Sequence, residues 1–292
     1  MKKIWIYAAI AVLLVVGSVF AYPKAEEGIA YIRALQSYVY GFPLVMMDLT
    51  RQVMTAAPSS GELSAPINQF QRLRAVVPWN FNNVVRISTN SLWSTGFLDL
   101  AKEPMIVSFP DGKGIPCAWR ALNMWTDVLA VGGTRHPDSK AGDSLFAGPG
   151  WNGTPPSNIT KVFHSSTRYA WFMVEMSAAG PEDFPRIHAL QDQLKITPLS
   201  AWGTSYAPPS SVQVDPGVDL TATPYDQVRL MTGEMFFKRL AMALKDNPPY
   251  PGDTAAIDRL KKLGVEPGKE FDPEKLDMDQ LRTSSTLPPE RH

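Results

Sequence analysis

Short runs of β-branched and aromatic residues follow one another through the middle of the chain. The runs cover residues 84–87, 91–100, 105–109, 119–131, 159–164 and 169–176. No helical pattern separates them, whereas a parallel α/β sheet needs a helix between its strands. The sequence therefore predicts an α+β fold that is mainly β, built on an antiparallel β-sandwich or barrel.

Turn residues and aromatic residues set how such a fold is stabilised. The chain has 26 prolines and 20 glycines, and Pro110-Asp111-Gly112 predicts a turn between two of the runs. Cys117 is the one cysteine of the sequence, so no intrachain disulfide can form. Stability must come from a packed core, for which 8 tryptophans and 13 phenylalanines are available. We expect Cys117 to be buried in that core.

Helical periodicity is expected on either side of the β region. Between Lys24 and Thr55 apolar residues recur at steps of three and four, and Gly41-Phe42-Pro43 predicts two helices or one kinked helix. A helix that begins at Pro181 is expected to end at Pro198. The sequence therefore predicts helices before the β region, between Lys24 and Thr55, and one helix directly after it, between Pro181 and Pro198.

A helical extension is predicted after a link rich in proline and serine over residues 207–216. Thr223-Pro224-Tyr225-Asp226 has the composition of a helix start. The helix that follows carries an apolar stripe formed by Val228, Met231, Met235 and Met242, which we expect to be buried against the β domain or against a second copy of the chain. Asp253 is expected to cap a short helix that ends at Gly264. The polar tail after Thr283 predicts disorder.

The first residues have the three parts of an export signal. Lys2 and Lys3 precede an apolar run from Ile4 to Phe20, and Val19 and Ala21 are small residues at the positions that signal peptidase prefers. The alternative is an uncleaved anchor, since about 17 apolar residues lie at the lower limit for a span. Either interpretation places the rest of the chain outside the cytoplasm: periplasmic or secreted, or anchored in the inner membrane and facing the periplasm.

The predicted organisation has four parts. Residues 1–21 are a signal peptide or anchor, 22–206 a β-rich domain with N-terminal helices, 207–283 a linker with a helical extension, and 284–292 a disordered tail. The formal net charge is zero, which excludes a basic surface for nucleic acid. Contact with a membrane is expected only through an uncleaved N-terminal segment.

Four ordered stretches carry a resemblance to a known family. They are Tyr38–Met47 (YVYGFPLVMM), Val85–Ser94 (VRISTNSLWS), Leu122–Asp127 (LNMWTD) and Ala141–Trp151 (AGDSLFAGPGW). Together they resemble the DUF1254 family of unknown function over roughly Ile29 to Trp202. The resemblance implies a jelly-roll-like antiparallel sandwich with flanking helices. It also implies a second domain, DUF1214, which we expect to be truncated or absent here.

The chain departs from the family pattern at two charged positions. Asn90-Ser91-Leu92-Trp93 stands where the family has an aspartate in Asp-Thr-Leu-Tyr, and Glu175 stands where it typically has an arginine. If the family has an ionic catalytic site, this member lacks it or uses another charge pattern.

Polar and aromatic residues within these stretches are the candidate ligand-binding residues. They are Arg86, Asn90, Trp93, Trp125, Asp127, Asp143 and Trp151. Flat rings stack on sugar C–H faces, and fixed donors and acceptors bind hydroxyl groups. We expect Arg86 and Asn90 to share one strand face in a cleft, with Asp127 or Asp143 opposite and Trp125 or Trp151 as a wall. The alternative is structural: Arg86 pairs with Asp99 or Asp127, and the tryptophans are core residues.

The sequence gives less support to an esterase site or a metal site. Gly142-Asp143-Ser144-Leu145 matches the nucleophile block of GDSL esterases, but no Asp-x-x-His follows it in the sequence. The four histidines, at 136, 164, 188 and 292, have no metal-ligand spacing, so we expect neither a metal nor a cofactor.

Two functions remain open. The first is an exported binding or assembly domain for carbohydrate or another small polar envelope ligand, acting as a homo-oligomer. The second is a glycan-acting hydrolase or lyase that uses Asp127 or Asp143 as general base and Arg86 as anion clamp. No residue is assigned a catalytic role under the first.

Overall fold

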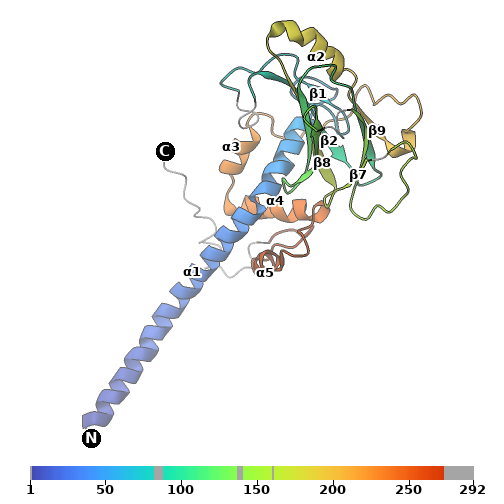
Figure 1. Cartoon of the computed structure of the whole chain (residues 1–292). Helices are drawn as coiled ribbons and strands as arrows, with labels where there is room; N and C mark the ends of the chain where they lie inside the picture. The colour runs from blue at the N-terminus through green and yellow to red at the C-terminus, as the bar shows by residue number, and fades with distance from the viewer. Residues whose placement is uncertain (1, 82–87, 137–140, 160, 273–292) are drawn as a thin grey trace. The chain divides into compact units, whose positions relative to one another are not determined.

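The chain forms two compact units. A computed structural model describes residues 2–81, 88–136, 141–159 and 161–272, and for residues 2–27 it describes the backbone alone. Within these, residues 2–42, 231–244 and 251–272 form a helical unit, and residues 43–230 and 245–250 form a sheet unit (Figure 1). The boundaries between the two units fall at 42/43, 230/231, 244/245 and 250/251.

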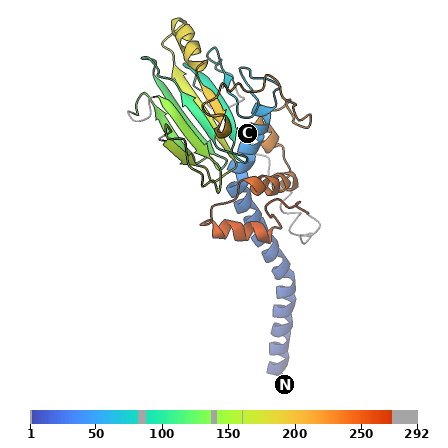
Figure 2. The ribbon, with the colours of Figure 1, turned by 90° about the vertical axis from the view of Figure 1, so that its right-hand side faces the viewer.

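The sheet unit contains two open sheets (Figure 2). The first has the order β1 (Gln71–Arg72), β2 (Ser91–Asp99), β8 (Tyr169–Ser177), β4 (Cys117–Asn123) and β5 (Val128–Gly133). The second has the order β7 (Lys161–His164), β6 (Gly142–Ala147), β3 (Met105–Phe109) and β9 (Lys195–Pro198). All pairs are antiparallel except β6 with β7, which is parallel. The protein is therefore a mixed α+β structure of mainly antiparallel sheets.

One core lies between the two sheets. Alternate residues of the first sheet, among them Leu92, Trp119 and Phe172, belong to the same buried cluster as Val107 and Phe146 of the second. The ring of Phe172 lies 5.6 Å from Phe146 and 5.3 Å from Trp119. Each such aromatic pair contributes about 0.5–1.5 kcal/mol beyond its buried area. The predicted source of stability, aromatic packing without a disulfide, is confirmed, and Cys117 is buried in this cluster.

The β-rich runs of the sequence correspond closely to strands. The runs 91–100, 105–109 and 169–176 match β2, β3 and β8 to within one residue. Residues 119–131 prove to be a hairpin of β4 and β5, because Thr126 has a φ of 69° that a continuous strand does not allow. The predicted strand 84–87 lies outside the described residues.

The turn between β3 and β4 lies further along the chain than predicted. Its positive φ values belong to Lys113 (45°) and Gly114 (87°), and the Ile115 amide donates to the Gly112 carbonyl at 2.8 Å. The positive φ predicted for Gly112 is therefore found at Gly114 instead.

Four short helices flank the sheets. They are η2 (Pro181–Asp183), α2 (Phe184–Gln191), η3 (Leu199–Ala201) and α3 (Pro224–Arg229). The helix expected up to Pro198 ends at Gln191, because Lys195–Pro198 pairs with β3 as an edge strand. The predicted start of α3 is confirmed: the Thr223 side chain accepts a hydrogen bond from the Asp226 amide.

The helical unit consists of the first part of α1 (Lys2–Thr55), most of α4 (Gly233–Asp246) and α5 (Thr254–Lys262). Of the two predicted forms, two separate helices is wrong, since α1 runs through Gly41-Phe42-Pro43 as one helix, and a kink at these residues stays a prediction. Pro43 cannot donate to the Val39 carbonyl four residues earlier. Val39 is 64% exposed, so water can satisfy that carbonyl. Asp253 precedes α5 as predicted, but its carboxylate accepts from Tyr40 and not from the helix.

The methionine stripe is not core. Val228 is buried, but Met235 and Met242 are 54% and 56% exposed. The chain leaves the helix at Leu230, and α4 begins afresh at Gly233, which resets the angular phase of the side chains. The buried face of α4 is formed by Phe236, Phe237, Leu240, Ala241 and Leu244. The prediction that Met235 and Met242 are buried is therefore wrong for this chain by itself.

No helix within the residues whose side chains are described is long and apolar enough to span a membrane. The side chains of the predicted export signal, and the tail after Thr283, lie outside those residues, so both remain predictions.

Candidate functional site

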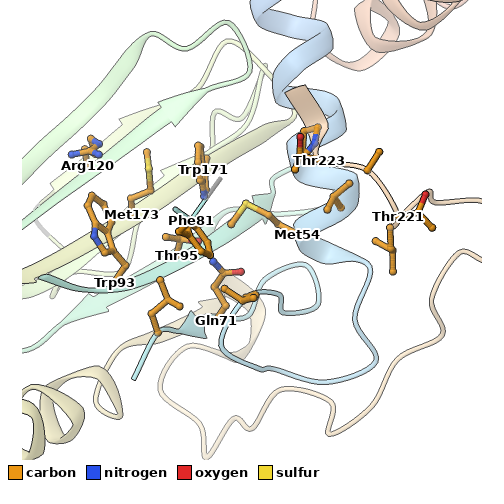
Figure 3. Close-up of a pocket in the computed structure, with 16 residues that line it drawn as sticks. Met54, Gln71, Phe81, Trp93, Thr95, Arg120, Trp171, Met173, Thr221 and Thr223 are labelled. Atoms are coloured by element: carbon orange, nitrogen blue, oxygen red, sulfur yellow. The ribbon is translucent and has the colours of Figure 1, made fainter. Parts of the chain in front are cut away.

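A pocket of about 260 Å³ opens on the sheet unit (Figure 3). Its floor is formed by side chains from four strands of the first sheet: Gln71, Trp93, Thr95, Arg120, Trp171 and Met173. Its walls come from the end of α1 and from loops, with Val53, Met54, Leu63, Leu73, Phe81 and residues 220–224. All these residues belong to one compact unit.

Strand periodicity places the floor on the face opposite the core. Leu92, Phe172 and Trp119 point between the sheets, so their neighbours Trp93, Trp171 and Arg120 point to the other side. The buried Gln191 side chain holds the edge of this floor, since its amide group donates to the carbonyls of Leu73 (3.0 Å) and Trp93 (3.1 Å). The pocket floor is therefore supported by main-chain pairing among four adjacent strands and by a buried amide.

Four polar atoms of the floor have no partner in the described part of the chain. They are Gln71 Oε1, Thr95 Oγ1, Trp93 Nε1 and Trp171 Nε1. Their residues are between 6% and 9% exposed, so burial withholds bulk water from these atoms. A buried polar atom without a partner costs about 1–3 kcal/mol, so native proteins usually satisfy such atoms. All four atoms belong to residues that line this one pocket.

Arg120 supplies the charge of the pocket. Its guanidinium lies 5.3 Å from the centre of the Trp93 ring, as a cation–π contact. It makes no ion pair with a described carboxylate. Glu175, the next residue after Met173 on the same strand face, accepts instead from Ser91 Oγ at 3.0 Å. Among the described lining residues there is no Asp, Glu, His or Cys side chain.

The loop on the other side of the pocket is held by its own hydrogen bonds. The Asp219 carboxylate accepts from the amide of Thr221 at 2.8 Å and from its hydroxyl at 2.6 Å. These bonds lower the pKa of Asp219. The Gln227 side chain donates to the carbonyls of Asp219 and Ala222, and Thr223 caps α3. Residues 219–224 thus form an ordered rim, anchored by the start of that helix.

Among the predicted site residues that the structure describes, Trp93 alone lines this pocket. Arg86 lies outside the described residues. Asn90 is exposed just before β2, where its side-chain oxygen accepts from Ser88 Oγ at 2.6 Å.

Trp125 and Asp127 shape the turn between β4 and β5. The Asn123 side-chain oxygen accepts from the amides of Trp125 (2.8 Å) and Asp127 (3.0 Å), and Trp125 Nε1 donates to the Pro248 carbonyl at 3.1 Å. Asp127 is exposed and accepts from the Tyr250 hydroxyl at 2.8 Å. This geometry is that of a turn held by the segment 245–250, and neither Trp125 nor Asp127 lines the pocket.

Asp143 and Trp151 belong to the second sheet and the loop after it. Asp143 pairs with Ser108 on β3, and Trp151 packs on a small buried cluster that contains Ile106 and Leu145. The adjacent Ser144 is buried within β6, not at the strand-to-helix turn that exposes a serine nucleophile. The structure therefore does not bring the described members of the predicted set together in one cleft.

Gln71, Thr95, Arg120 and Trp171 were not proposed from the sequence. Alternation could have pointed to two of them: Thr95 shares a strand face with Trp93, and Trp171 shares one with Met173. Gln71 and Arg120 reach the pocket only through the strand order, which places β1 and β4 on either side of the β2–β8 pair.

No group of three or more His, Cys, Asp or Glu side chains in the described residues is placed to hold a metal ion. Burial raises the pKa of the Cys117 thiol, which disfavours the thiolate form that a nucleophile or metal ligand needs.

Fold and pocket together define a mixed α+β protein of mainly antiparallel sheets with a ligand-type pocket on the outer face of one sheet. Residues 67–198 match the family model described as "Protein of unknown function (DUF1254)", and the resemblance to this family is thereby shown. The match leaves out the Tyr38–Met47 stretch and contains the other three.

Two solved structures are similar to the chain. The VPA0106 protein from Vibrio parahaemolyticus is 23% identical, with a TM-score of 0.64 over 87% of this chain, which shows a shared fold. The chain spans 56% of the length of that structure. An uncharacterized protein from Burkholderia cenocepacia is 13% identical over 85% of this chain and 63% of its own, with a TM-score of 0.30. No curated protein matches the chain.

Proposed function

We propose that the chain is an exported binding protein whose pocket on the first sheet takes a small organic ligand. One observation carries the proposal: four buried polar atoms without a partner in the described part of the chain all belong to residues that line this one pocket. A ligand with complementary groups would remove the cost of those unpaired atoms, and that gain becomes binding energy.

The lining favours binding over catalysis. Glycoside hydrolysis usually uses two carboxylates on either side of the scissile bond, and the described lining residues include none. Asp127 and Asp143, the candidate general bases, are not among them. The guanidinium of Arg120 carries hydrogen-bond donors and no acceptor, which makes it a poor general base. A glycan-acting hydrolase or lyase stays the second candidate function. It rests on the sequence-based roles of Asp127 or Asp143 as general base and Arg86 as anion clamp.

Carbohydrate or another small polar envelope ligand is the class expected from the sequence. The pocket supports a ligand of that size, because its volume of about 260 Å³ lies just below the range of ~300–1,000 Å³ for small-molecule sites. The indole rings of Trp93 and Trp171 offer flat faces and N–H donors to such a ligand. Export, a jelly-roll connection of the strands and self-association belong to the same proposal.

A ligand-observed NMR screen tests the function directly. Monosaccharides, small organic acids and small amides would be screened against the wild type, Trp93→Phe and the matched control Trp202→Phe. Trp93→Phe keeps a ring but removes an unpaired N–H donor, whereas Trp202 Nε1 already donates to Asn158, outside the pocket. We expect compounds that bind the wild type to bind Trp93→Phe several-fold more weakly and Trp202→Phe unchanged.

Two results would contradict the proposal. One is equal binding of every compound to Trp93→Phe and the wild type. The other is release of reducing sugar from an envelope glycan incubated with the wild type, abolished in Asp127→Asn or Asp143→Asn, which would support the hydrolase instead.

A further inference from the structure

We propose that the ligand is a small carboxylic acid with an apolar body, and that Arg120 binds its carboxylate. This inference rests on the proposed function, binding in the pocket, and adds the chemical class of the ligand.

The charge of the pocket carries the first step. Arg120 is the one titratable side chain in the described lining, and no described carboxylate forms an ion pair with it. The Trp93 ring offers the guanidinium a π face and no lone pair, so this contact does not satisfy its N–H donors as a hydrogen-bond acceptor would. A planar guanidinium binds a planar carboxylate through two parallel hydrogen bonds. The pocket therefore has one uncompensated positive charge in the geometry that suits this anion.

The unpaired atoms carry the second step. Indole N–H groups only donate, so Trp93 and Trp171 both require an acceptor, and the Thr95 hydroxyl can donate as well. Gln71 Oε1 is the one unpaired atom of the four that can only accept. A ligand richer in acceptors than in donors satisfies this set, and a carboxylate has acceptors alone at neutral pH.

The walls carry the third step. Apart from the polar floor, the pocket presents Val53, Met54, Leu63, Leu73, Phe81 and Met173. Figure 3 shows Arg120 and Trp93 at one end of the pocket and Thr221 and Thr223 at the other, with Met173, Phe81 and Met54 between them. A carboxylate at the Arg120 end would therefore place the body of the ligand among these apolar side chains. A sugar in that position would leave hydroxyls buried without partners.

Four probe compounds test separately whether the charge of a ligand and the polarity of its body affect binding. Phenylacetate and its neutral counterpart phenylacetamide share an apolar body, and glucuronate and methyl glucoside share a polar one. Their dissociation constants would be measured by calorimetry at neutral pH on the purified full chain. We expect phenylacetate to bind at least about tenfold more tightly than phenylacetamide and glucuronate, because a charge-assisted pair contributes on the order of one decade in affinity.

Two substitutions assign that preference to Arg120. Arg120→Gln is expected to reduce phenylacetate binding to the level of phenylacetamide. Arg135→Gln, which changes an exposed arginine outside the pocket, is expected to change neither. If Arg120→Gln fails to fold, Arg120→Met keeps a stem that packs on Trp93 and gives the same comparison.

Three outcomes would overturn the inference. Equal binding of phenylacetate and phenylacetamide would contradict the role of charge, and so would phenylacetate binding that is unchanged in Arg120→Gln. Neither result would contradict the proposal that the pocket binds a ligand. Tighter binding of glucuronate than of phenylacetate would contradict the proposal that the body of the ligand is apolar. No binding by any probe also overturns the inference, while the wider NMR screen decides separately whether the pocket binds a ligand at all.

Discussion

Thr95 is the residue that tests most simply whether the pocket is built for a ligand. Its hydroxyl is buried on a strand without a partner in the described residues. Thr95→Val keeps the shape and the β-branched side chain but removes the unpaired oxygen. We expect the unliganded variant to be more stable than the wild type by about 1 kcal/mol, because an unsatisfied buried hydroxyl costs roughly that much. Chemical denaturation in urea measures the difference.

The matched control is Thr167→Val. Thr167 is also buried, but its hydroxyl donates to the Tyr169 carbonyl at 2.7 Å and accepts from the Met124 amide at 3.1 Å. This change should destabilise the fold by about 1–3 kcal/mol. Equal destabilisation by both substitutions would mean that the Thr95 hydroxyl has a structural partner.

At the scale of elements, an ion network centred on Arg168, the residue before β8, joins the end of β2 to the segment 245–250. Arg168 donates to both carboxylate oxygens of Asp99, at 2.9 and 2.8 Å, and to Asp246 at 3.0 Å. Burial tends to raise the pKa of Asp99, but the hydrogen bonds from Arg168 and the Ala101 amide outweigh it and hold the pKa below its usual value. The network therefore stabilises the protein when Asp99 is ionised.

The sign of the pH effect follows from that lowered pKa. The contribution of Asp99 is fully present above its unfolded pKa of about 4 and is lost as the pH falls through the folded value. Melting temperatures measured from pH 6 to pH 3 should therefore fall more steeply for the wild type than for Asp99→Asn. At pH 7, Arg168→Met should cost about 2 kcal/mol, less than for a fully buried pair because the side chains are partly exposed. Parallel pH profiles of wild type and Asp99→Asn would contradict this account.

A close contact between α1 and α4 tests the packing of the helical unit. A Cβ atom added to Gly41 would lie 2.5 Å from Leu240 Cδ2, in a fully buried side chain. Gly41→Val should therefore destabilise the protein by about 1–3 kcal/mol through overpacking. Gly28 lies in the same helix with nothing within 4 Å of the added atom, so Gly28→Ala should be neutral or stabilising by up to ~1 kcal/mol. Thermal melts compare the two, and a neutral Gly41→Val would exclude the contact.

At the scale of the whole molecule, the first prediction concerns export. Protein recovered from the periplasm should begin at Tyr22, because Val19 and Ala21 satisfy signal peptidase. N-terminal sequencing or intact mass identifies that end. An intact Met1 end in washed membranes would establish an anchor instead.

The second whole-molecule prediction is self-association. The helical unit exposes apolar residues in pairs seven positions apart, Ile32 with Val39 on α1 and Met235 with Met242 on α4. Two residues at this spacing lie on one helix face, and exposed apolar faces tend to be covered by a partner. We expect light scattering to give a homo-oligomer, and Met235→Glu to shift it towards monomer. A monomer mass for the wild type at high micromolar concentration would contradict this prediction.

Local sequence was sufficient for much of the fold and for little of the site. The runs that became β2, β3 and β8, the Thr223 cap and the buried Cys117 were predicted because each depends on neighbours in the chain. The parallel β6–β7 pair and the edge strand β9 were missed, since their pairing partners are remote in sequence. For the same reason Trp125 and Asp127, which belong to the family-like stretch Leu122–Asp127, proved to shape a turn and not to line the pocket.

The sequence by itself determined the periodicity, and with it which side chains of each strand share a face. Trp93 and Thr95 must lie together because side chains alternate along any strand. Only the tertiary structure decided which face became the core and which became the pocket. That choice depends on the strand order β1-β2-β8-β4, which brings Gln71, Trp93, Trp171 and Arg120 onto one surface. Strand order arises from contacts between residues far apart in the chain, and no local pattern encodes them.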